Sequence, residues 1–278
     1  MKKNKMVSPV VKWVGGKRQL LNELTPLFPK KINAYCEPFI GGGAVLFSKQ
    51  PSNAYINDVN SDLINIYEVI RDNVEELITS LKKHKNESEY FYKIRDIDRN
   101  HKEFNKLSNI ERASRMLYLN KTCFNGLYRV NNAGEFNSPF GNYKNPNFVN
   151  EPTLRAVNKY FNEAIIYMFN DDYSVVLQKL PKESFVYLDP PYDPISATSN
   201  FTGYTRGGFG REEQVRLREW CDELDNRGIK FMLSNSATDF IKEQYSAYNI
   251  KIVKARRAIN SVASKRGDVD EVVVRNYE

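Results

Sequence analysis

The sequence predicts an α/β protein with a mainly parallel sheet that helices cover on both faces, and a helical insertion in the middle of the chain. Two observations carry this prediction. Short apolar runs of strand length alternate with helical patterns, which is typical of parallel sheets with crossover helices. Between about 60 and 163, by contrast, the chain has helical periodicity and loops but no good strand. We therefore interpret this middle part as an insertion.

The first elements follow in order along the chain. Strands are predicted at AYCEPF (34–39) and AYIND (54–58), and a helix-compatible stretch follows the glycines after the first. Apolar residues recur at three- and four-residue steps from Ser61 to Leu81, which predicts a helix. A second apolar stripe predicts a helix over 109–121.

The second half of the chain returns to the alternating pattern. Further strands are predicted at 164–169, 185–188, 229–235, 249–255 and 271–277. The stretch 212–228 lies between two of them and has helical character. Gly228 supplies its stop signal, because glycine is favoured just beyond a helix C-terminus.

Composition excludes several classes of protein. The chain has 278 residues, of which 41% are hydrophobic, so it can bury a core and is not disordered. No apolar run approaches the ~20 residues that span a bilayer. The basic N-terminal stretch has no long apolar segment and no cleavage site, so it is not a secretory signal. Three widely spaced cysteines suit a reducing cytoplasm, and with only two histidines we expect no metal site.

Positive charge exceeds negative charge, with 41 Lys and Arg against 34 Asp and Glu. This excess is compatible with nucleic acid binding and equally with a solvated surface. Residues 121–144 interleave basic side chains with aromatic residues, Asn and Gly. A second basic cluster near the C-terminus consists of Arg256, Arg257, Lys265 and Arg266.

Glycines mark the turn after the first predicted strand, in EPFIGGGA (37–44). Glycines there let the backbone approach a ligand and leave helix N–H groups pointing at it. Asp58 ends the next strand, where a carboxylate can accept hydrogen bonds from ribose hydroxyls. Together they indicate a nucleoside cofactor, although an ordinary tight turn would need the same glycines. The spacing is not G-x-G-x-x-G, which disfavours a dinucleotide.

The tetrapeptide DPPY (189–192) follows the apolar run FVYL at a predicted strand end. Its two prolines stiffen the loop and lack the N–H donors that would occupy nearby carbonyls. Asp189 and the Pro190 carbonyl can then act as two acceptors for one exocyclic amine. Tyr192 offers a flat face for an unstacked base. The alternative is a proline-stiffened turn in which the aspartate caps a helix.

Five segments occur in a characteristic order: KWVGGK (12–17), EPFIGGGA (37–44), IND (56–58), DPPY (189–192) and SATSNFTGY (196–204). With this combination the chain closely resembles the Dam-type DNA adenine N6-methyltransferases, including the DpnII-type modification methylases. The resemblance runs from about Val11 to Asn276. It implies a seven-stranded, mainly parallel sheet of the S-adenosylmethionine-dependent methyltransferase (Rossmann-like) type. The catalytic domain would comprise 1–59 and 164–278, and an inserted helical target-recognition domain would comprise 60–163.

The resemblance also implies S-adenosyl-L-methionine as cofactor. Trp13 and Lys17 would lie against it. Phe39 and the glycines Gly41 to Gly43 would pass under its methionyl part.

Three aspartates enter the implied site. Asp58 would hold the ribose, and Asp172 matches the residue that binds the cofactor adenine. Asp171 stands where the family more often has Gly. Asp189 would face both the cofactor and the target amine, and it would act in catalysis with Pro190 and Tyr192.

FNGLYR (124–129), followed by GEFNSPFGNYKNP (134–146), resembles the DNA-reading hairpin of the family. In that match Arg129 reads a base edge and Phe124 wedges into the base stack. The residues that match DNA contacts are Lys12, Phe124, Asn125, Arg129 and Pro139.

Lys12 would reach the first target base pair or its phosphate. This set is associated with the sequence GATC. Asn142 stands where many relatives carry Arg, so one contact to DNA is expected to be missing.

The implied reaction transfers a methyl group to N6 of an adenine in double-stranded DNA, after the base has flipped out of the helix. It needs neither a metal nor a covalent intermediate, so Cys123 and Cys221 are interpreted as packing residues. A cognate restriction endonuclease acting separately would be the protein partner. Three alternatives stay open: a methyltransferase for cytosine N4 or RNA adenine, a DNA-binding protein that has lost catalysis, and a nicotinamide-dependent oxidoreductase.

Overall fold

The computed structural model describes residues 3–195, 208–256 and 268–278. Segment 196–204, which carries part of the family resemblance, lies outside the described residues. Arg257, Lys265 and Arg266 of the C-terminal basic cluster lie outside them as well.

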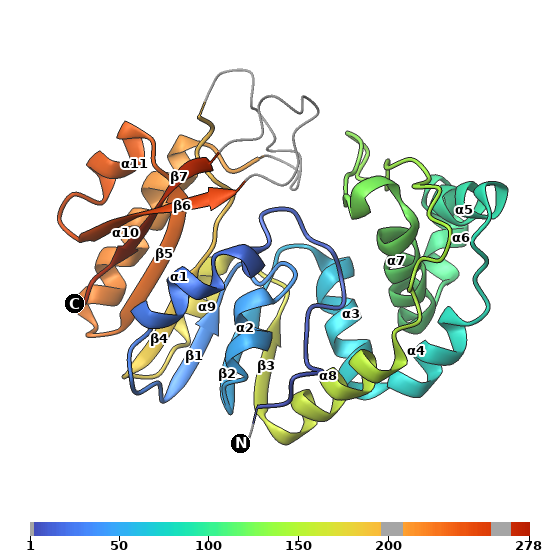
Figure 1. Ribbon diagram of the computed structural model, residues 1–278, viewed down its shortest axis with the longest axis horizontal. Helices are drawn as coiled ribbons and strands as arrows, with labels where there is room; N and C mark the ends of the chain where they lie inside the picture. Colours follow the sequence, from blue (N-terminus) through green and yellow to red (C-terminus); the bar gives the residue numbers. More distant parts are fainter. Residues whose placement is uncertain (1–2, 196–207, 257–267) are drawn as a thin grey trace. The chain divides into compact units, whose positions relative to one another are not determined.

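Seven strands form one sheet in the order β3-β2-β1-β4-β5-β7-β6 (Figure 1). They are β1 (Ala34–Glu37), β2 (Asn53–Asn57), β3 (Ile165–Phe169), β4 (Ser184–Leu188), β5 (Lys230–Ser236), β6 (Asn249–Arg256) and β7 (Asp268–Arg275). Every predicted strand is present. Strand β1 runs parallel to β2 and β4, and β4 runs parallel to β5, whereas β7 is antiparallel to both β5 and β6. The mainly parallel α/β fold is therefore confirmed.

The central strands are apolar because both of their faces are covered. Every residue of β1 and β4 is buried, and all of β5 except Lys230 is buried. Continuous apolar runs rather than alternating ones are expected for such strands. The sequence DPPY begins directly after Leu188, so this loop leaves the sheet from a strand that is fixed on both faces.

The chain divides into two compact units. The first unit comprises Met1–Gly16, Gly41–Ser52 and Asp58–Asn170, and the second comprises Lys17–Ile40, Asn53–Asn57 and Asp171–Glu278. Strand β3 belongs to the first unit and the other six strands to the second.

The second unit also holds η1 (Lys17–Gln19), α1 (Leu21–Leu24), η2 (Thr25–Leu27), α9 (Tyr173–Gln178), α10 (Arg211–Asn226) and α11 (Asp239–Gln244). Helix α10 packs against β5 through buried residues such as Leu217 and Leu224. Gly228 follows this helix in the left-handed region, with φ 68°, and its N–H donates to the Asp225 carbonyl. The predicted stop signal is confirmed.

Helices dominate the first unit. They are α2 (Ala44–Lys49), α3 (Ser61–Asp72), α4 (Val74–Leu81), α5 (Ser88–Arg95), η3 (Asp96–Arg99), α6 (His101–Lys106), α7 (Asn109–Thr122), η4 (Phe124–Gly126) and α8 (Glu151–Glu163). Figure 1 shows α3, α4 and α5, in cyan to teal, beside α7 in green, and α7 contacts all three; α8, in yellow-green, contacts α3 and α4.

The single helix predicted from Ser61 to Leu81 is wrong in one respect. Asn73 has φ −140° and ψ 42°, so the chain breaks into α3 and α4. Apolar residues keep their helical spacing across the break, and Ile70, Val74 and Leu77 are all buried. Because periodicity records only which residues are buried, it cannot register one non-helical residue between two helices.

Candidate functional site

In the first unit the glycine turn is built around Trp13. Gly41 and Gly43 have φ of 47° and 67°, a region that side chains disfavour. A Cβ on Gly41 would lie 2.8 Å from Cδ1 of Trp13, so the indole is in contact with the glycine backbone. Both the backbone conformation and the space therefore require glycine at position 41. Two predicted cofactor-binding positions, Trp13 and Gly41, are in contact.

Asp58 is tied to the same turn. Its Oδ2 accepts a hydrogen bond from the Gly41 N–H at 3.0 Å, and its Oδ1 accepts one from the Asn60 N–H at 2.9 Å. Burial raises the pKa of Asp58 to about 6, although both backbone hydrogen bonds favour the charged form. Tyr67 donates its hydroxyl proton to the Gly41 carbonyl at 2.6 Å. The carboxylate that was predicted to bind ribose thus also holds the glycine turn.

Sequence reasoning missed Tyr128, which stacks on Trp13. The two rings lie 4.9 Å apart and are inclined by 21°. Tyr128 is buried, and burial raises its pKa to about 12. It lies between Leu127 and Arg129, within the FNGLYR motif, so an aromatic residue in that motif was the available signal.

Lys12 is anchored through its backbone. Asn120 of α7 accepts from the Lys12 N–H at 2.8 Å and donates its side-chain amide to the Lys12 carbonyl, also at 2.8 Å. The aliphatic part of the side chain lies against Gly126, where an added Cβ would be 3.0 Å from Cβ of Lys12. The ammonium group is 5.3 Å from the centre of the Tyr143 ring. The exposed side chain of Lys12 therefore starts from a fixed position.

Residues 123–140 form a loose antiparallel hairpin, which we call the recognition hairpin. Isolated β-bridges join Cys123 to Phe140 and Val130 to Phe136. The four residues of this hairpin that were predicted to contact DNA all have exposed side chains; they are Phe124, Asn125, Arg129 and Pro139. Phe124 is 55% exposed, so its ring is accessible to a ligand.

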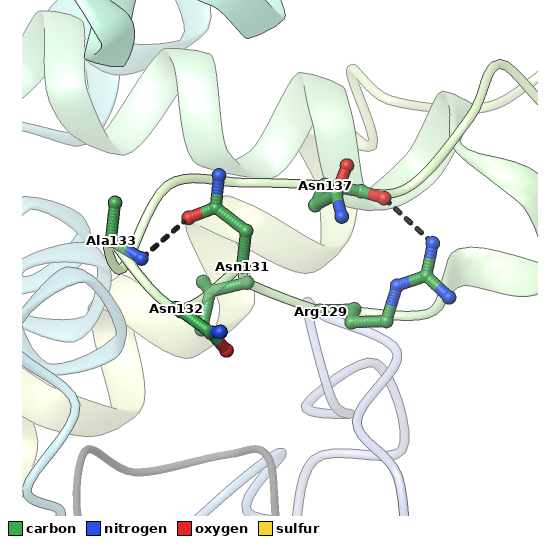
Figure 2. Close-up of a pocket in the computed structure, with 6 residues that line it drawn as sticks. Arg129, Asn131, Asn132, Ala133 and Asn137 are labelled. Atoms are coloured by element: carbon green, nitrogen blue, oxygen red, sulfur yellow. Dashed lines mark hydrogen bonds between the residues drawn. The ribbon is translucent and has the colours of Figure 1, made fainter.

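Arg129 lies at the edge of a surface hollow of about 660 Å³. Figure 2 shows the hollow, which Arg129, Val130, Asn131, Asn132, Ala133 and Asn137 line. The guanidinium group of Arg129 donates to the Asn137 carbonyl at 2.8 Å. Asn131 accepts hydrogen bonds from the N–H groups of Ala133 and Glu135, both at 3.0 Å, and so closes the tip. Arg129 is thus directed by the opposite strand of the hairpin.

In the second unit the DPPY loop carries an ion pair. Nζ of Lys17 lies 2.8 Å from Oδ1 of Asp189, and the two side chains are only 6% and 19% exposed. Burial raises the pKa of Asp189 to about 6, and Lys17 opposes this rise. The same ammonium group is 4.5 Å from the centre of the Tyr192 ring. Lys17 therefore contacts two other residues that were predicted for the site, Asp189 and Tyr192.

Sequence reasoning missed Glu271, the partner of Tyr192. The Tyr192 hydroxyl donates to Oε2 of Glu271 in β7 at 2.7 Å. Burial, with Asp189 and Glu271 nearby, raises the pKa of Tyr192 well above its usual value, so the phenol remains a donor. An acidic residue that opens the apolar run EVVV was the available signal.

Buried polar groups hold the loop beyond Tyr192. Asp193 accepts a hydrogen bond from the Thr238 hydroxyl at 2.7 Å, and its N–H donates to Asn235 at 3.1 Å. Gln214 of α10 donates to the Pro191 carbonyl at 2.8 Å. Pro190 itself is buried. These contacts fix the orientation of the whole loop relative to the sheet.

Asp172 caps α9, where Oδ1 accepts from the Ser174 N–H at 3.0 Å. Arg216 binds both carboxylate oxygens, at 2.7 and 3.0 Å. Burial opposes the charged form, but the hydrogen bonds from Arg216 and Ser174 outweigh it, so the pKa of Asp172 is lowered. A cofactor that used this carboxylate would compete with Arg216. Phe39 packs against the Tyr173 ring at 5.1 Å.

Both units contain buried cysteines. All three cysteines are free and buried, and burial raises the pKa of each thiol, which suits packing. Within 3–195, 208–256 and 268–278 no group of three or more His, Cys, Asp or Glu side chains could hold a metal ion. In the same ranges no helix has the length and apolar character needed to cross a membrane.

Comparison with known protein families decides the identity of the chain. The family model for the D12 class N6 adenine-specific DNA methyltransferases matches residues 13–259. The chain belongs to this family. As a member of this family, the protein is an enzyme that methylates N6 of adenine in DNA. The match spans the glycine turn, the recognition hairpin and the DPPY loop, and all three lie among the described residues.

Curated relatives cover nearly the full length of this methyltransferase. It is 44% identical over 280 residues to "Type II methyltransferase M1.LlaDCHI" of Lactococcus lactis subsp. cremoris, covering 100% of this chain and 98% of the relative. It is 41% identical to "Type II methyltransferase M.MjaIII" of Methanocaldococcus jannaschii, covering 98% and 99%. It is 36% identical to "DNA adenine methylase" of Escherichia coli (strain K12), covering 98% and 95%. The resemblance to Dam-type enzymes is confirmed.

Proposed function

We propose that this methyltransferase transfers a methyl group from S-adenosylmethionine to N6 of adenine within GATC, after flipping the base out of duplex DNA. The observation that carries the proposal is the DPPY loop. A buried strand and buried polar contacts hold it rigid, and it presents Asp189 and Tyr192 side by side with Lys17. Such a loop offers fixed acceptors and an aromatic face, which are the groups that a flipped adenine needs.

The donor groups of the chain fit S-adenosylmethionine. In the first unit, Asp58 offers a carboxylate suited to ribose hydroxyls, and the half-buried Gly41 links it to the Trp13 indole. In the second unit, Lys17, Phe39, Asp172 and Asp189 offer charged and aromatic contacts. The residues that we propose to bind the cofactor are Trp13, Lys17, Phe39, Gly41, Gly43, Asp58, Asp172 and Asp189. The cofactor would supply an electrophilic methyl group.

The chain's own residues would prepare the adenine amine. This amine is a poor nucleophile because its lone pair is delocalised into the ring. Asp189 and the Pro190 carbonyl would each accept a hydrogen bond from one of its two N–H groups. These bonds would favour a pyramidal nitrogen with an available lone pair. Tyr192 would stack on the base and hold it in place, so that catalysis depends mainly on positioning.

Residues 60–163 would form the target-recognition domain, with 1–59 and 164–278 as the catalytic domain. Within it, the exposed side chains of the recognition hairpin support a role in reading DNA. Arg129 would contact a base edge, Phe124 would wedge into the base stack, and Asn125 and Pro139 would line the surface. Lys12 would reach the first base pair or its phosphate.

Two further parts of the proposal concern the biological setting. Two of the relatives are named type II methyltransferases, which supports a cognate restriction endonuclease acting separately. A DNA substrate supports the cytoplasmic location predicted from the sequence.

Asp189→Ala tests the catalytic part. Loss of one amine acceptor is expected to lower kcat by about 10²–10³-fold or more, by analogy with the loss of a preorganised hydrogen-bonding group. Duplex affinity, measured by fluorescence anisotropy, should survive. A variant with near-normal turnover would remove Asp189 from the mechanism.

Arg129→Ala tests sequence reading. Loss of a bidentate contact to guanine should cost ~1–3 kcal/mol of discrimination at one base pair. kcat/KM is measured on a GATC duplex and on duplexes with each single-base change, at two salt concentrations. If Arg129 touches only phosphate, the preference ratios stay at wild-type values and only the salt dependence of binding falls.

A further inference from the structure

The backbone of Phe136 in the recognition hairpin is bound on both sides by neighbouring residues of η3. Its N–H donates to Oδ2 of Asp98 at 2.8 Å. Its carbonyl accepts from Nη2 of Arg99 at 2.7 Å. Asp98 and Arg99 also pair with each other. One carboxylate and one guanidinium group therefore hold both hydrogen-bonding groups of a single residue, an arrangement that we call the Phe136 clamp.

The clamp is fixed from behind by α7. Arg115 of α7 lies 2.8 Å from Oδ2 of Asp98, and these two side chains are only 6% and 11% exposed. The same guanidinium group donates to the carbonyls of Ile94 at 2.9 Å and Arg95 at 2.6 Å, in the last turn of α5. A buried charge that is paired and hydrogen-bonded in this way has one well-defined position.

The clamp fixes the part of the hairpin that directs Arg129. Phe136 forms a β-bridge with Val130, and its ring packs edge-on against Tyr128 at 5.9 Å. The next residue, Asn137, donates its N–H to the Arg129 carbonyl at 2.7 Å and accepts from the Arg129 guanidinium group at 2.8 Å (Figure 2). The position of the Asn137 carbonyl, and with it the direction of the guanidinium group, follows from where Phe136 is held.

We propose that Asp98 and Arg99 are positioning residues for sequence recognition: they hold Phe136 so that Arg129 meets one base edge in a fixed geometry. This inference rests on the proposed role of Arg129 in reading DNA. Neither Asp98 nor Arg99 contacts DNA in this account. A bidentate contact to a base tolerates little misplacement, so loosening the clamp reduces discrimination before it reduces catalysis.

The experiment compares Asp98→Asn and Arg99→Met with the matched control Asp72→Asn. Asp72 also pairs with the arginine beside it in sequence, with Nε of Arg71 at 2.8 Å, but at the end of α3. kcat/KM is measured for each variant on the preferred duplex and on duplexes altered at one base pair. Asp98→Asn is also combined with Arg129→Ala. Thermal unfolding checks folding, and Arg99→Met serves if Asp98→Asn does not fold.

Both clamp variants should lose about tenfold of the discrimination at the base pair that Arg129 reads, within the range for one bidentate contact. The control should keep the wild-type ratio. In the Arg129→Ala background, Asp98→Asn should cause no further loss, because the residue that it positions is gone. Equal loss of activity on all duplexes, or an additional loss of discrimination in the double variant, would overturn the proposal. If Arg129→Ala itself keeps wild-type discrimination, the proposed role of Arg129 fails and the clamp proposal fails with it.

Discussion

The Lys17–Asp189 ion pair makes a quantitative prediction about how methyl transfer depends on pH. Asp189 is the stronger acceptor for the adenine amine when it is ionised, because hydrogen bonds to a charged acceptor are roughly twice as strong as neutral ones. Its pKa is raised to about 6 from an ordinary value near 3.8. With a pKa of about 6, about one tenth of Asp189 is ionised at pH 5, so kcat/KM, which reports the free enzyme, should fall about tenfold between pH 7.5 and pH 5. An unperturbed aspartate would show no such loss above pH 5.

Lys17→Met tests the origin of this fall in activity at acidic pH, which we call the acid limb of the pH profile. Lys17 lowers the pKa of Asp189, whereas burial and the nearby Glu271 raise it. Without the ammonium group the pKa of Asp189 rises further, so the limb should move to higher pH. Asp58 has a pKa of about 6 as well, but it belongs to the first unit and has no interaction with Lys17 among the causes of its shift. A limb that stays in place in Lys17→Met would assign it to Asp58, and a rate that is flat from pH 7.5 to 5 would refute the reasoning.

Two other predictions concern the first unit. Gly41→Ala should weaken the affinity for S-adenosylhomocysteine in calorimetry about tenfold, since the new Cβ displaces Trp13 and ~1–2 kcal/mol of backbone strain is added. Gly134→Ala shares the positive φ without a neighbour within 4 Å, so equal loss in both variants would count against a contact between Trp13 and the cofactor. His84 is hydrogen-bonded to Tyr90 and Ser114, and burial lowers its pKa to about 4. Because the unfolded chain binds the proton already near pH 6.5, the folded state loses stability as the pH falls below that value. Between pH 7 and 5 the free energy of unfolding should fall by about 2 kcal/mol more in wild type than in His84→Gln. Urea unfolding at each pH measures it, and an equal fall in both proteins would contradict the prediction.

The centre of the sheet was predictable because β1, β4 and β5 are buried on both faces. A strand such as β4, with all five residues buried, leaves a continuous apolar run of strand length in the sequence. The DPPY loop was placed correctly for the same reason, since it begins where this run ends. The break at Asn73 was not predictable, because the buried positions continue through it at helical spacing.

The sequence could mark candidate partners of the site residues, but it could not say which of them meet. Glu271 reaches Tyr192 from β7, a strand that enters the sheet antiparallel between β5 and β6. Asp98 reaches Phe136 across 38 positions of sequence. Such pairs depend on how elements pack, whereas propensity and periodicity describe only neighbours along the chain. Residue identity predicted the chemistry of the site, and tertiary structure decided which charges and rings meet.

The most direct test of the central claim is the identity of the methylated base and of its methyl donor. Purified protein is incubated with duplex DNA containing GATC and with S-adenosylmethionine whose methyl group carries three deuterium atoms. The DNA is then digested to nucleosides and analysed by mass spectrometry, with Asp189→Ala as the control. We predict N6-methyldeoxyadenosine that carries the deuterated methyl group, formed by the wild type and strongly reduced in the variant. Label in N4-methyldeoxycytidine, or no label in any nucleoside, would contradict the account.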